Sequence, residues 1–396
     1  MPTDEISDLL RTAPLIDGHN DLLWAVRDAG AKAGSDWSPP DLTQPQHGLM
    51  TDLPRLRAGC VGGQFWSVYV PSDLPGHEAV TQTLEQIDAL AQLVRRYPDH
   101  LERARTADDV ERIASAGRVA SMIGVEGGHS IGSSLGVLRI LADLGAGYLT
   151  LTHNDDTPWA DSATGTAPHG GLTRFGEEVV RELNRTGVLV DLSHVSPDTM
   201  RHALAVSEAP AFFSHSSARA LCDVTRNVPD DVLESVRASG GVVMITFVAS
   251  FITSEGAVAN AAAWEEAARL RAAHPDEPRV VGAAMDAWFD EHPDPPATIG
   301  DVADHIDHVR EVAGIDHIGI GSDFDGASMP EGLEDVSRYP ALFAELANRG
   351  YDDEDLRKIA GRNVLGVMRA AEQIAARLQR ERPPSPATIE GLDGVS

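Results

Sequence analysis

Six side chains of metal-binding types stand at or just beyond the ends of apolar segments: His19, Asp21, Glu126, His194, His215 and Asp323. Imidazole nitrogens and carboxylate oxygens together suit hard to borderline divalent metals, zinc included. If the apolar segments are parallel strands of an α/β barrel, their carboxyl ends meet on one face, where barrel enzymes keep their chemistry. The pattern therefore predicts a metal site on that face.

The spacing of these residues indicates which of them could bind the same ion. His19 and Asp21 are two positions apart, so on a strand both side chains point the same way and one ion could take both. Glu126 directly follows the apolar SMIGV, and a carboxylate can bridge two ions. His194 and His215 end successive predicted strands, which lie about 4.8 Å apart in a sheet. Each motif alone is more typical of a turn, surface or structural residue, whereas the joint arrangement favours a metal site.

Four polar residues, Asp323 among them, could handle a substrate. His153 ends the fourth predicted strand and could hold an oxyanion, or else belong to a helix cap. Arg226 offers a planar fork to a carboxylate, or else forms an ordinary loop salt bridge. Asp323 and Asp325 are both candidates for an acid or base beside a metal, although Asp325 could equally cap the next segment.

The elements that must position these side chains alternate between strands and helices. Near-continuous apolar runs, typical of strands buried on both faces, predict eight strands. They cover residues 14–19, 61–70, 119–126, 146–153, 187–194, 209–215, 240–248 and 317–323. Helical spacing predicts helices over 77–97, 135–144 and 353–379, and Ser196-Pro197-Asp198 predicts a helix start. The fold class is thus α/β, a (β/α)8 TIM barrel.

The long connection at 249–316 after the seventh strand interrupts this alternation. Its Ala-rich part, 257–290, predicts an inserted helical excursion and a candidate lid over the site. We expect one metal-dependent hydrolase domain over residues 1–380, because 396 residues suit a barrel with insertions. The Pro-rich segment 381–396 predicts a disordered tail.

Composition excludes several classes of partner. The formal net charge is −29, from 61 acidic and 32 basic residues, which argues against binding nucleic acid or an anionic membrane. There are two cysteines and no CxxC pattern, so neither a thiolate zinc site nor a disulfide scaffold is expected. The N-terminus does not read as a signal peptide, and no run approaches the ~20 apolar residues of a membrane span, so a cytoplasmic location is expected.

The motifs together resemble a known family. DGHND, VGGQFWSVY, EGG, LTHN, the DLSH and SHS pair, TRN and GSDFDG occur in the order found in the renal (membrane) dipeptidases, a branch of the amidohydrolase superfamily. The resemblance covers about residues 14–370. It is specific, because generic metal barrels share the polar strand ends but not VGGQFWSVY or GSDFDG.

The resemblance implies a binuclear zinc site, with two Zn²⁺ per chain. His19 and Asp21 would hold one ion, His194 and His215 the other, and Glu126 would bridge them. The substrate-handling residues implied are His153 at the oxyanion, Arg226 at a substrate carboxylate, Asp323 as general base and acid, and Tyr69 and Trp24 at the pocket mouth.

The activity implied is hydrolysis of dipeptides, including L-X-D-Y dipeptides, by attack of a hydroxide that bridges the two ions. Asp323 would take the proton of the nucleophile and deliver it to the leaving amine. The chain lacks the secretion signal, lipid-anchor tail and disulfide cysteines of mammalian members. Cell-surface placement and a disulfide-linked dimer are therefore not implied, although a homodimer is expected from the family.

Two other functions fit the same residues. The first is a binuclear metallohydrolase of lactams, lactones or other cyclic amides, which would differ only in the shape of its pocket. The second is a catalytically silent barrel that acts as a binding protein. The presence of every expected ligand type disfavours the silent barrel.

Overall fold

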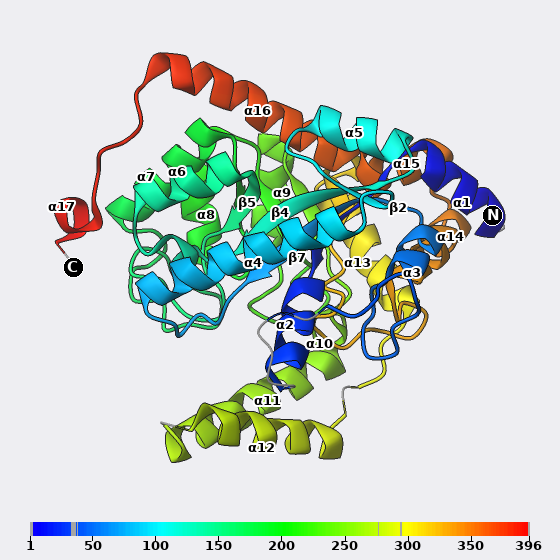
Figure 1. Ribbon diagram of the computed structural model, residues 1–396, viewed down its shortest axis with the longest axis horizontal. Helices are drawn as coiled ribbons and strands as arrows, with labels where there is room; N and C mark the ends of the chain where they lie inside the picture. The colour runs from blue at the N-terminus through cyan, green and yellow to red at the C-terminus, as the bar shows by residue number, and fades with distance from the viewer. Residues whose placement is uncertain (1–2, 33–36, 38, 276, 294, 395–396) are drawn as a thin grey trace.

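A closed barrel of parallel strands forms the centre of the molecule (Figure 1). The computed structural model describes residues 3–32, 37, 39–275, 277–293 and 295–394. The strands are β1 (Leu15–Asn20), β2 (Val61–Tyr69), β3 (Leu101–Arg103), β4 (Val119–Glu126), β5 (Ala146–Thr150), β6 (Leu189–Asp191), β7 (Phe212–Ser216), β8 (Val242–Ile245) and β9 (Ile318–Ile320). Pairing runs β2-β1-β9-β8-β7-β6-β5-β4, and a β2–β4 pairing closes the ring. The predicted (β/α)8 barrel is confirmed.

Each of the eight predicted strands corresponds to one barrel strand, and β3 was not expected. β3 pairs in parallel with the first residues of β4, on the edge where β5 pairs further along. With only three residues, β3 is too short to give a period-2 pattern in the sequence.

Helices surround the barrel. They are α1 (Thr3–Thr12), α2 (Leu22–Lys32), α3 (Leu53–Ala58), α4 (Gly76–Arg96), α5 (Ala107–Ser115), α6 (Leu135–Leu144), α7 (Arg174–Thr186), α8 (Pro197–Val206), α9 (Asp230–Ser239), α10 (Ala249–Ile252), α11 (Ser254–Ala273), α12 (Pro278–Glu291), α13 (Ile299–Val312), α14 (Tyr339–Asn348), α15 (Asp353–Arg357), α16 (Asn363–Glu381) and α17 (Ile389–Asp393). The predicted helices at 77–97 and 135–144 match α4 and α6. The start at Ser196 is also confirmed, because its side chain accepts a hydrogen bond from the Thr199 amide and Pro197 opens α8.

The barrel interior is filled by large side chains. Phe65, Tyr148 and Phe212 come from three different strands, and their ring centres lie 5.3–6.0 Å apart. All three side chains are fully buried. The centre of the barrel is therefore a packed core, and a substrate site is possible only at an end.

The connection after β8 leaves the barrel as a pair of helices. α11 and α12 form a hairpin that projects from the barrel, at the bottom of Figure 1. This is the helical insertion predicted at 257–290. Thr253 caps α11 by accepting from the Gly256 amide, and Ala267 and Leu270 are the buried residues of its later turns.

The sequence predicts a disordered tail at 381–396, but in the structure residues 382–394 contact the rest of the protein. This segment carries α17, which packs on α7. Ile389 is buried, and the Asp393 carboxylate accepts a hydrogen bond of 2.7 Å from the Thr173 hydroxyl. Pro-rich composition predicted a free tail, but these two contacts fix its end; residues 395–396 lie outside the described part.

Candidate active site

A cavity of about 350 Å³ opens at the carboxyl ends of the strands. Its lining is Asp21, Trp24, Tyr69, Glu126, His153, Asn154, His194, Arg226, Val248, Phe251, Trp264, Asp323, Gly326 and Ala327. Eight of the eleven residues singled out in the sequence belong to this lining, and His19 and His215 lie beside Glu126. The structure thus brings ten of them together, whereas Asp325 lies outside the lining and accepts a hydrogen bond from the Met50 amide.

Glu126 lies at the centre of the cluster, at the end of β4. Its two carboxylate oxygens face different histidines. Oε2 lies 3.5 Å from Nε2 of His19, while Oε1 lies 3.1 Å from Nε2 of His194 and 3.7 Å from Nε2 of His215. One carboxylate therefore separates the cluster into two groups of ligand atoms, one on each side.

The first group comes from the end of β1. His19 Nε2 lies 3.4 Å from Asp21 Oδ2 and 3.9 Å from Asp323 Oδ1. Asp21 follows β1 directly, and its backbone amide donates to the Phe324 carbonyl at 2.8 Å. The backbone bond ties the H-x-D motif to the segment that carries Asp323.

The second group comes from β7 and the turn after β6. The Nε2 atoms of His194 and His215 lie 3.0 Å apart. His215 belongs to β7, but β6 ends at Asp191, so His194 lies in the following turn with φ 66°. A residue with a β-carbon rarely adopts this left-handed conformation, and such strain is common at functional sites. The predicted strand 187–194 is therefore too long at its end.

Three orienting hydrogen bonds were not anticipated from the sequence. The His19 ring contacts the Tyr148 hydroxyl through Nδ1 at 2.8 Å, and the His215 ring contacts the Ser214 hydroxyl through Nδ1 at 2.8 Å. The Ser67 hydroxyl donates to Glu126 Oε2 at 2.9 Å. Such partners fix the orientation of ligand side chains and tune their basicity.

Burial and neighbouring charges shift the pKa values of two carboxyl groups in the cluster in opposite directions. Burial raises the pKa of Glu126, but the facing His19, His194 and His153 outweigh it and hold that pKa well below its usual range. For Asp323, burial and the nearby carboxylates of Asp21 and Glu126 outweigh the attraction of His19 and raise its pKa well above the usual range. The Glu126 carboxylate is therefore ionised, whereas the Asp323 carboxyl has a strong affinity for a proton.

His153 lies beside the second histidine group. β5 ends at Thr150, and His153 follows in the next turn, with its Nε2 3.7 Å from Glu126 Oε1. Burial lowers its pKa to about 4, so the ring is neutral at pH 7. The Tyr69 ring packs on it at 4.8 Å, and Trp24 meets Tyr69 edge-on at 4.9 Å, so the two aromatic residues line the same side of the cavity.

Arg226 is a buried cation, with 4% of its surface exposed. Its Nη2 makes one long contact of 3.5 Å with the His215 carbonyl. Within the described part of the chain, Nε and Nη1 have no hydrogen-bond partner. Burial lowers the pKa of Arg226 to about 10, which leaves it charged at neutral pH. A buried guanidinium with unsatisfied donors is suited to receive an anion.

The donor set fits the binding of divalent metal. Potential ligand atoms lie within 4.8 Å of one another in three groups of the described residues: His19, Glu126 and His215; Glu126, His153 and His194; and His19, Asp21 and Asp323. His19 Nε2 is buried without a hydrogen-bond partner in the described structure, although carboxylates approach it. Converging imidazoles and carboxylates that leave such an atom unsatisfied are the environment a metal ion completes.

Comparison with known proteins identifies the family. The model of the membrane dipeptidase family (peptidase family M19) matches residues 3–382. The chain belongs to the membrane dipeptidase family. Its activity class is that of a metal-dependent dipeptidase, a hydrolase.

Solved structures of related proteins share the fold of this dipeptidase. The probable dipeptidase PvdM from Pseudomonas aeruginosa is 25% identical, with a TM-score of 0.79 over 94% of this chain and 99% of its own. A metallopeptidase from Rhodobacter sphaeroides, liganded with a phosphinate mimic of the dipeptide L-Ala-D-Ala, is 26% identical, with a TM-score of 0.75 over 91% and 99%. The metallopeptidase called dipeptidase AC is 28% identical, with a TM-score of 0.74 over the same shares.

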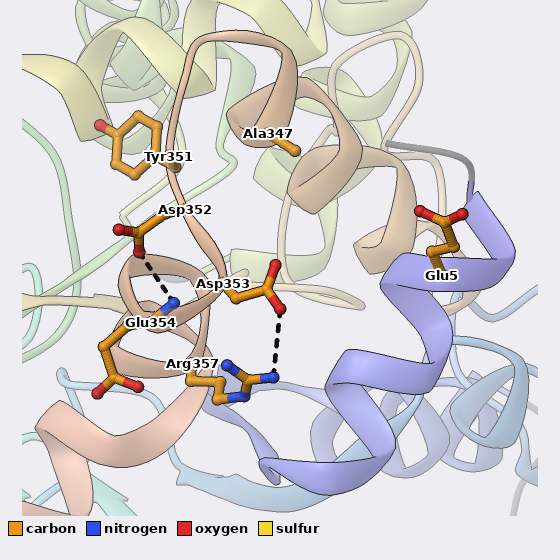
Figure 2. A pocket seen from close by; sticks show the side chains of 7 residues that line it. All are labelled: Glu5, Ala347, Tyr351, Asp352, Asp353, Glu354 and Arg357. Atoms are coloured by element: carbon orange, nitrogen blue, oxygen red, sulfur yellow. Dashed lines mark hydrogen bonds and ion pairs between the residues drawn. The ribbon is translucent and has the colours of Figure 1, made fainter.

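A larger hollow of about 710 Å³ lies elsewhere on the dipeptidase, between α1 and the segment around α15 (Figure 2). Its lining is Glu5, Ala347, Tyr351, Asp352, Asp353, Glu354 and Arg357. Two of its acidic residues have structural partners, since Asp352 caps α15 by accepting from the Glu354 amide and Asp353 pairs with Arg357. This hollow contains none of the predicted site residues, so its size does not make it the site.

In the described ranges of the dipeptidase, no helix is both long and apolar enough to cross a membrane.

Proposed function

We propose that the chain is a binuclear zinc dipeptidase that cleaves dipeptides, L-X-D-Y dipeptides among them. The observation that carries the proposal is the position of Glu126, whose two oxygens face separate groups of histidines. A single ion would need only one of these groups. A carboxylate shared between two groups supports a pair of ions held close together.

The residues proposed to hold the ions are compatible with these distances. His19 and Asp21 form one half of the site, His194 and His215 form the other half, and Glu126 is common to both. When bound, such ions lower the pKa of water and polarise a carbonyl, which supplies a nucleophile near neutral pH. Nitrogen and oxygen ligands without thiolate are compatible with zinc.

Arg226 is proposed to bind the free carboxylate of the substrate. A dipeptide has a carboxylate one residue away from its only peptide bond, so a fixed guanidinium near the cluster selects for short substrates. A carboxylate at Arg226 would satisfy the donors Nε and Nη1, which are otherwise buried without partners. The cavity volume of about 350 Å³ suits a small molecule of this kind.

Asp323 and His153 are proposed to handle the proton and the developing oxyanion. The raised pKa of Asp323 favours a carboxyl that takes a proton from the nucleophile and returns it to the leaving amine. His153 is neutral at pH 7, so it can donate a hydrogen bond to an oxyanion without competing as a cation for Glu126.

A related protein supports the acceptance of a D residue in the second position of the substrate. The related Rhodobacter sphaeroides metallopeptidase was solved with a phosphinate mimic of L-Ala-D-Ala, and it covers 91% of this chain. We infer that a D residue is accepted in the second position here as well.

The direct test is turnover of a dipeptide panel with L or D residues in the second position, by protein whose metal content has been measured. About two zinc ions per chain together with cleavage of L-X-D-Y substrates would support the proposal. Two zinc ions without cleavage of any dipeptide would contradict it and favour cyclic amides or lactones as substrates. One ion per fully active chain would contradict the binuclear site.

A second test addresses Arg226. We expect Arg226→Met to raise KM for dipeptides by at least about 10-fold, because the carboxylate loses a charge-assisted bidentate partner. Dipeptide amides, which lack the carboxylate, serve as the control substrates. If Arg226 binds the carboxylate, the wild-type preference for acid over amide disappears in the variant; an unchanged kcat/KM for the free acids would remove Arg226 from the site.

A further inference from the structure

One wall of the cavity is apolar and comes from the chain after β8. It consists of Val248, Phe251 on α10 and Trp264 on α11. Phe251 and Trp264 are half-buried, so part of each ring faces the cavity. The projecting hairpin α11–α12 (Figure 1) thus reaches the site through a single large side chain, Trp264.

Hydrogen bonds from buried side chains hold this wall in place. The Asn227 side chain donates to the Phe251 carbonyl at 2.7 Å. His305 accepts from the Ala218 amide through Nδ1 at 3.0 Å, so its Nε2–H donates to the Ile252 carbonyl at 3.1 Å. Two buried side chains therefore tie α10 to the segment that carries Arg226, which makes the wall a preformed surface.

The wall adjoins the proposed carboxylate site. The guanidinium carbon of Arg226 lies 5.4 Å from the centre of the Phe251 ring. In a dipeptide, the free carboxylate and the C-terminal side chain leave the same α-carbon. A substrate whose carboxylate binds Arg226 therefore brings its C-terminal side chain close to Phe251, whereas its N-terminal residue extends beyond the scissile bond at the metal cluster.

The charges of the cavity favour an uncharged side chain at this wall. The acidic groups of the lining, Asp21, Glu126 and Asp323, belong to the metal cluster, and Arg226 is its only cation. An acidic or basic C-terminal side chain would lose water at the wall without gaining an ion pair. An aromatic or large aliphatic side chain would bury apolar surface there.

We propose that Val248, Phe251 and Trp264 form the binding pocket for the C-terminal side chain and select dipeptides with an aromatic or large aliphatic residue in that position. The inference rests on the proposed dipeptidase function and on the carboxylate role of Arg226. It makes Trp264, on the inserted hairpin, a specificity-determining residue.

The test compares kcat/KM for L-Ala-D-Phe, L-Ala-D-Leu, L-Ala-Gly and L-Ala-D-Asp, with L forms alongside. We expect the wild type to prefer Phe over Gly and Asp by about 10-fold or more, the discrimination that a hydrophobic pocket typically gives. In Trp264→Ala the Phe-to-Gly ratio should fall about 10-fold. Trp288→Ala is the matched control, because Trp288 lies on α12, stacks on His292 and does not line the cavity.

The outcomes separate this inference from the proposed function. A wild type that cleaves dipeptides but prefers Gly or Asp overturns the pocket while leaving the dipeptidase intact. A Phe-to-Gly ratio that falls equally in both tryptophan variants also overturns it, because the effect would then be general to the hairpin. Absence of cleavage of every dipeptide refutes the proposed function itself. If Trp264→Ala does not fold, the wild-type ranking of the substrates still tests the pocket. Trp264→Leu is then the second variant, and we expect it to weaken the preference for Phe over Leu.

Discussion

Among single residues, substitution of Asp323 best distinguishes an effect on metal binding from an effect on the chemical step. Its Oδ1 lies 3.9 Å from His19 Nε2, and burial with two neighbouring carboxylates raises its pKa. We expect Asp323→Asn to keep both metal ions and to lose at least about 100-fold in kcat, because a carboxamide cannot take up the proton. The measurement is kcat together with metal content per chain. Activity near wild type would assign the proton transfer to another group, and loss of metal would make Asp323 a ligand.

Tyr148 tests the orienting hydrogen bonds around the ligands. Its hydroxyl contacts His19 Nδ1 at 2.8 Å within the barrel core. We expect Tyr148→Phe to weaken metal affinity about 10-fold to 100-fold, as is typical when such a partner is lost. Metal affinity is measured by competition with a chelator. Tyr97→Phe is the control, since its hydroxyl also accepts a hydrogen bond, from the Leu42 amide, but lies outside the cluster. Equal affinities in the two variants would show that the Tyr148 bond does not tune the site.

The two kinds of site residue differ in how far the sequence reveals them. The proposed ligands His19 and Glu126 interrupt apolar runs, so their gathering at one end of the barrel was predictable. Tyr148 and Ser67 lie inside strands, where a tyrosine or serine is an ordinary residue. Their function depends on which strands become neighbours, which no local pattern contains. The same limit explains why Trp264, on an inserted helix, was not predicted.

Among the elements, the eight barrel strands and their order were predictable, but the short strand β3 and the strand ends were not. The runs 187–194 and 317–323 predicted strands that reach His194 and Asp323, yet β6 and β9 end earlier, at Asp191 and Ile320. Both site residues have positive φ, 66° and 69°. Hydrophobic periodicity marks the buried part of a strand but not the turn that re-aims the next side chain. That turn conformation comes from the surrounding packing.

The link between α13 and α10 predicts a pH dependence of stability. Burial lowers the pKa of His305 on α13 to about 4, whereas an unfolded histidine has a pKa near 6.5. Below pH 6.5 the unfolded chain takes up a proton that the folded chain refuses, so stability falls as the pH falls towards 4. From pH 7 to pH 5, this one residue should lower the free energy of unfolding by about 2 kcal/mol.

Denaturant unfolding of metal-free protein at the two pH values measures this effect. His305→Gln serves as the comparison, because glutamine can also donate and accept but does not titrate. The wild type should lose about 2 kcal/mol more than the variant between pH 7 and pH 5. Equal losses would mean that His305 is already protonated in the folded chain at pH 5, against its contact with the Ala218 amide.

At the scale of the whole molecule, the cluster adds to an existing excess of negative charge. The chain has a net charge of −29, and the cavity lining gathers the acidic residues Asp21, Glu126 and Asp323 around one arginine, Arg226. Carboxylates held close together in a buried site repel one another more strongly than on the surface. The closed barrel fixes their spacing, so the protein cannot relieve the repulsion by moving one strand end alone. Two bound divalent ions would attract these carboxylates and so offset the repulsion between them.

Metal removal should therefore destabilise the entire barrel. Ions that bind only the folded chain stabilise it by about 4 kcal/mol when free metal is 1,000 times Kd. We expect chelation to lower Tm by several degrees and added zinc to restore it, measured by thermal unfolding with and without EDTA. Glu126→Ala is the matched control, because Glu126 belongs to two of the three groups of potential ligands in the described residues. The variant lacks this shared carboxylate, so the difference in Tm between its metal-bound and metal-free forms should be smaller than in the wild type. A metal-dependent shift as large in Glu126→Ala as in the wild type would mean that the ions bind without the bridge, and the two halves of the site would then be independent.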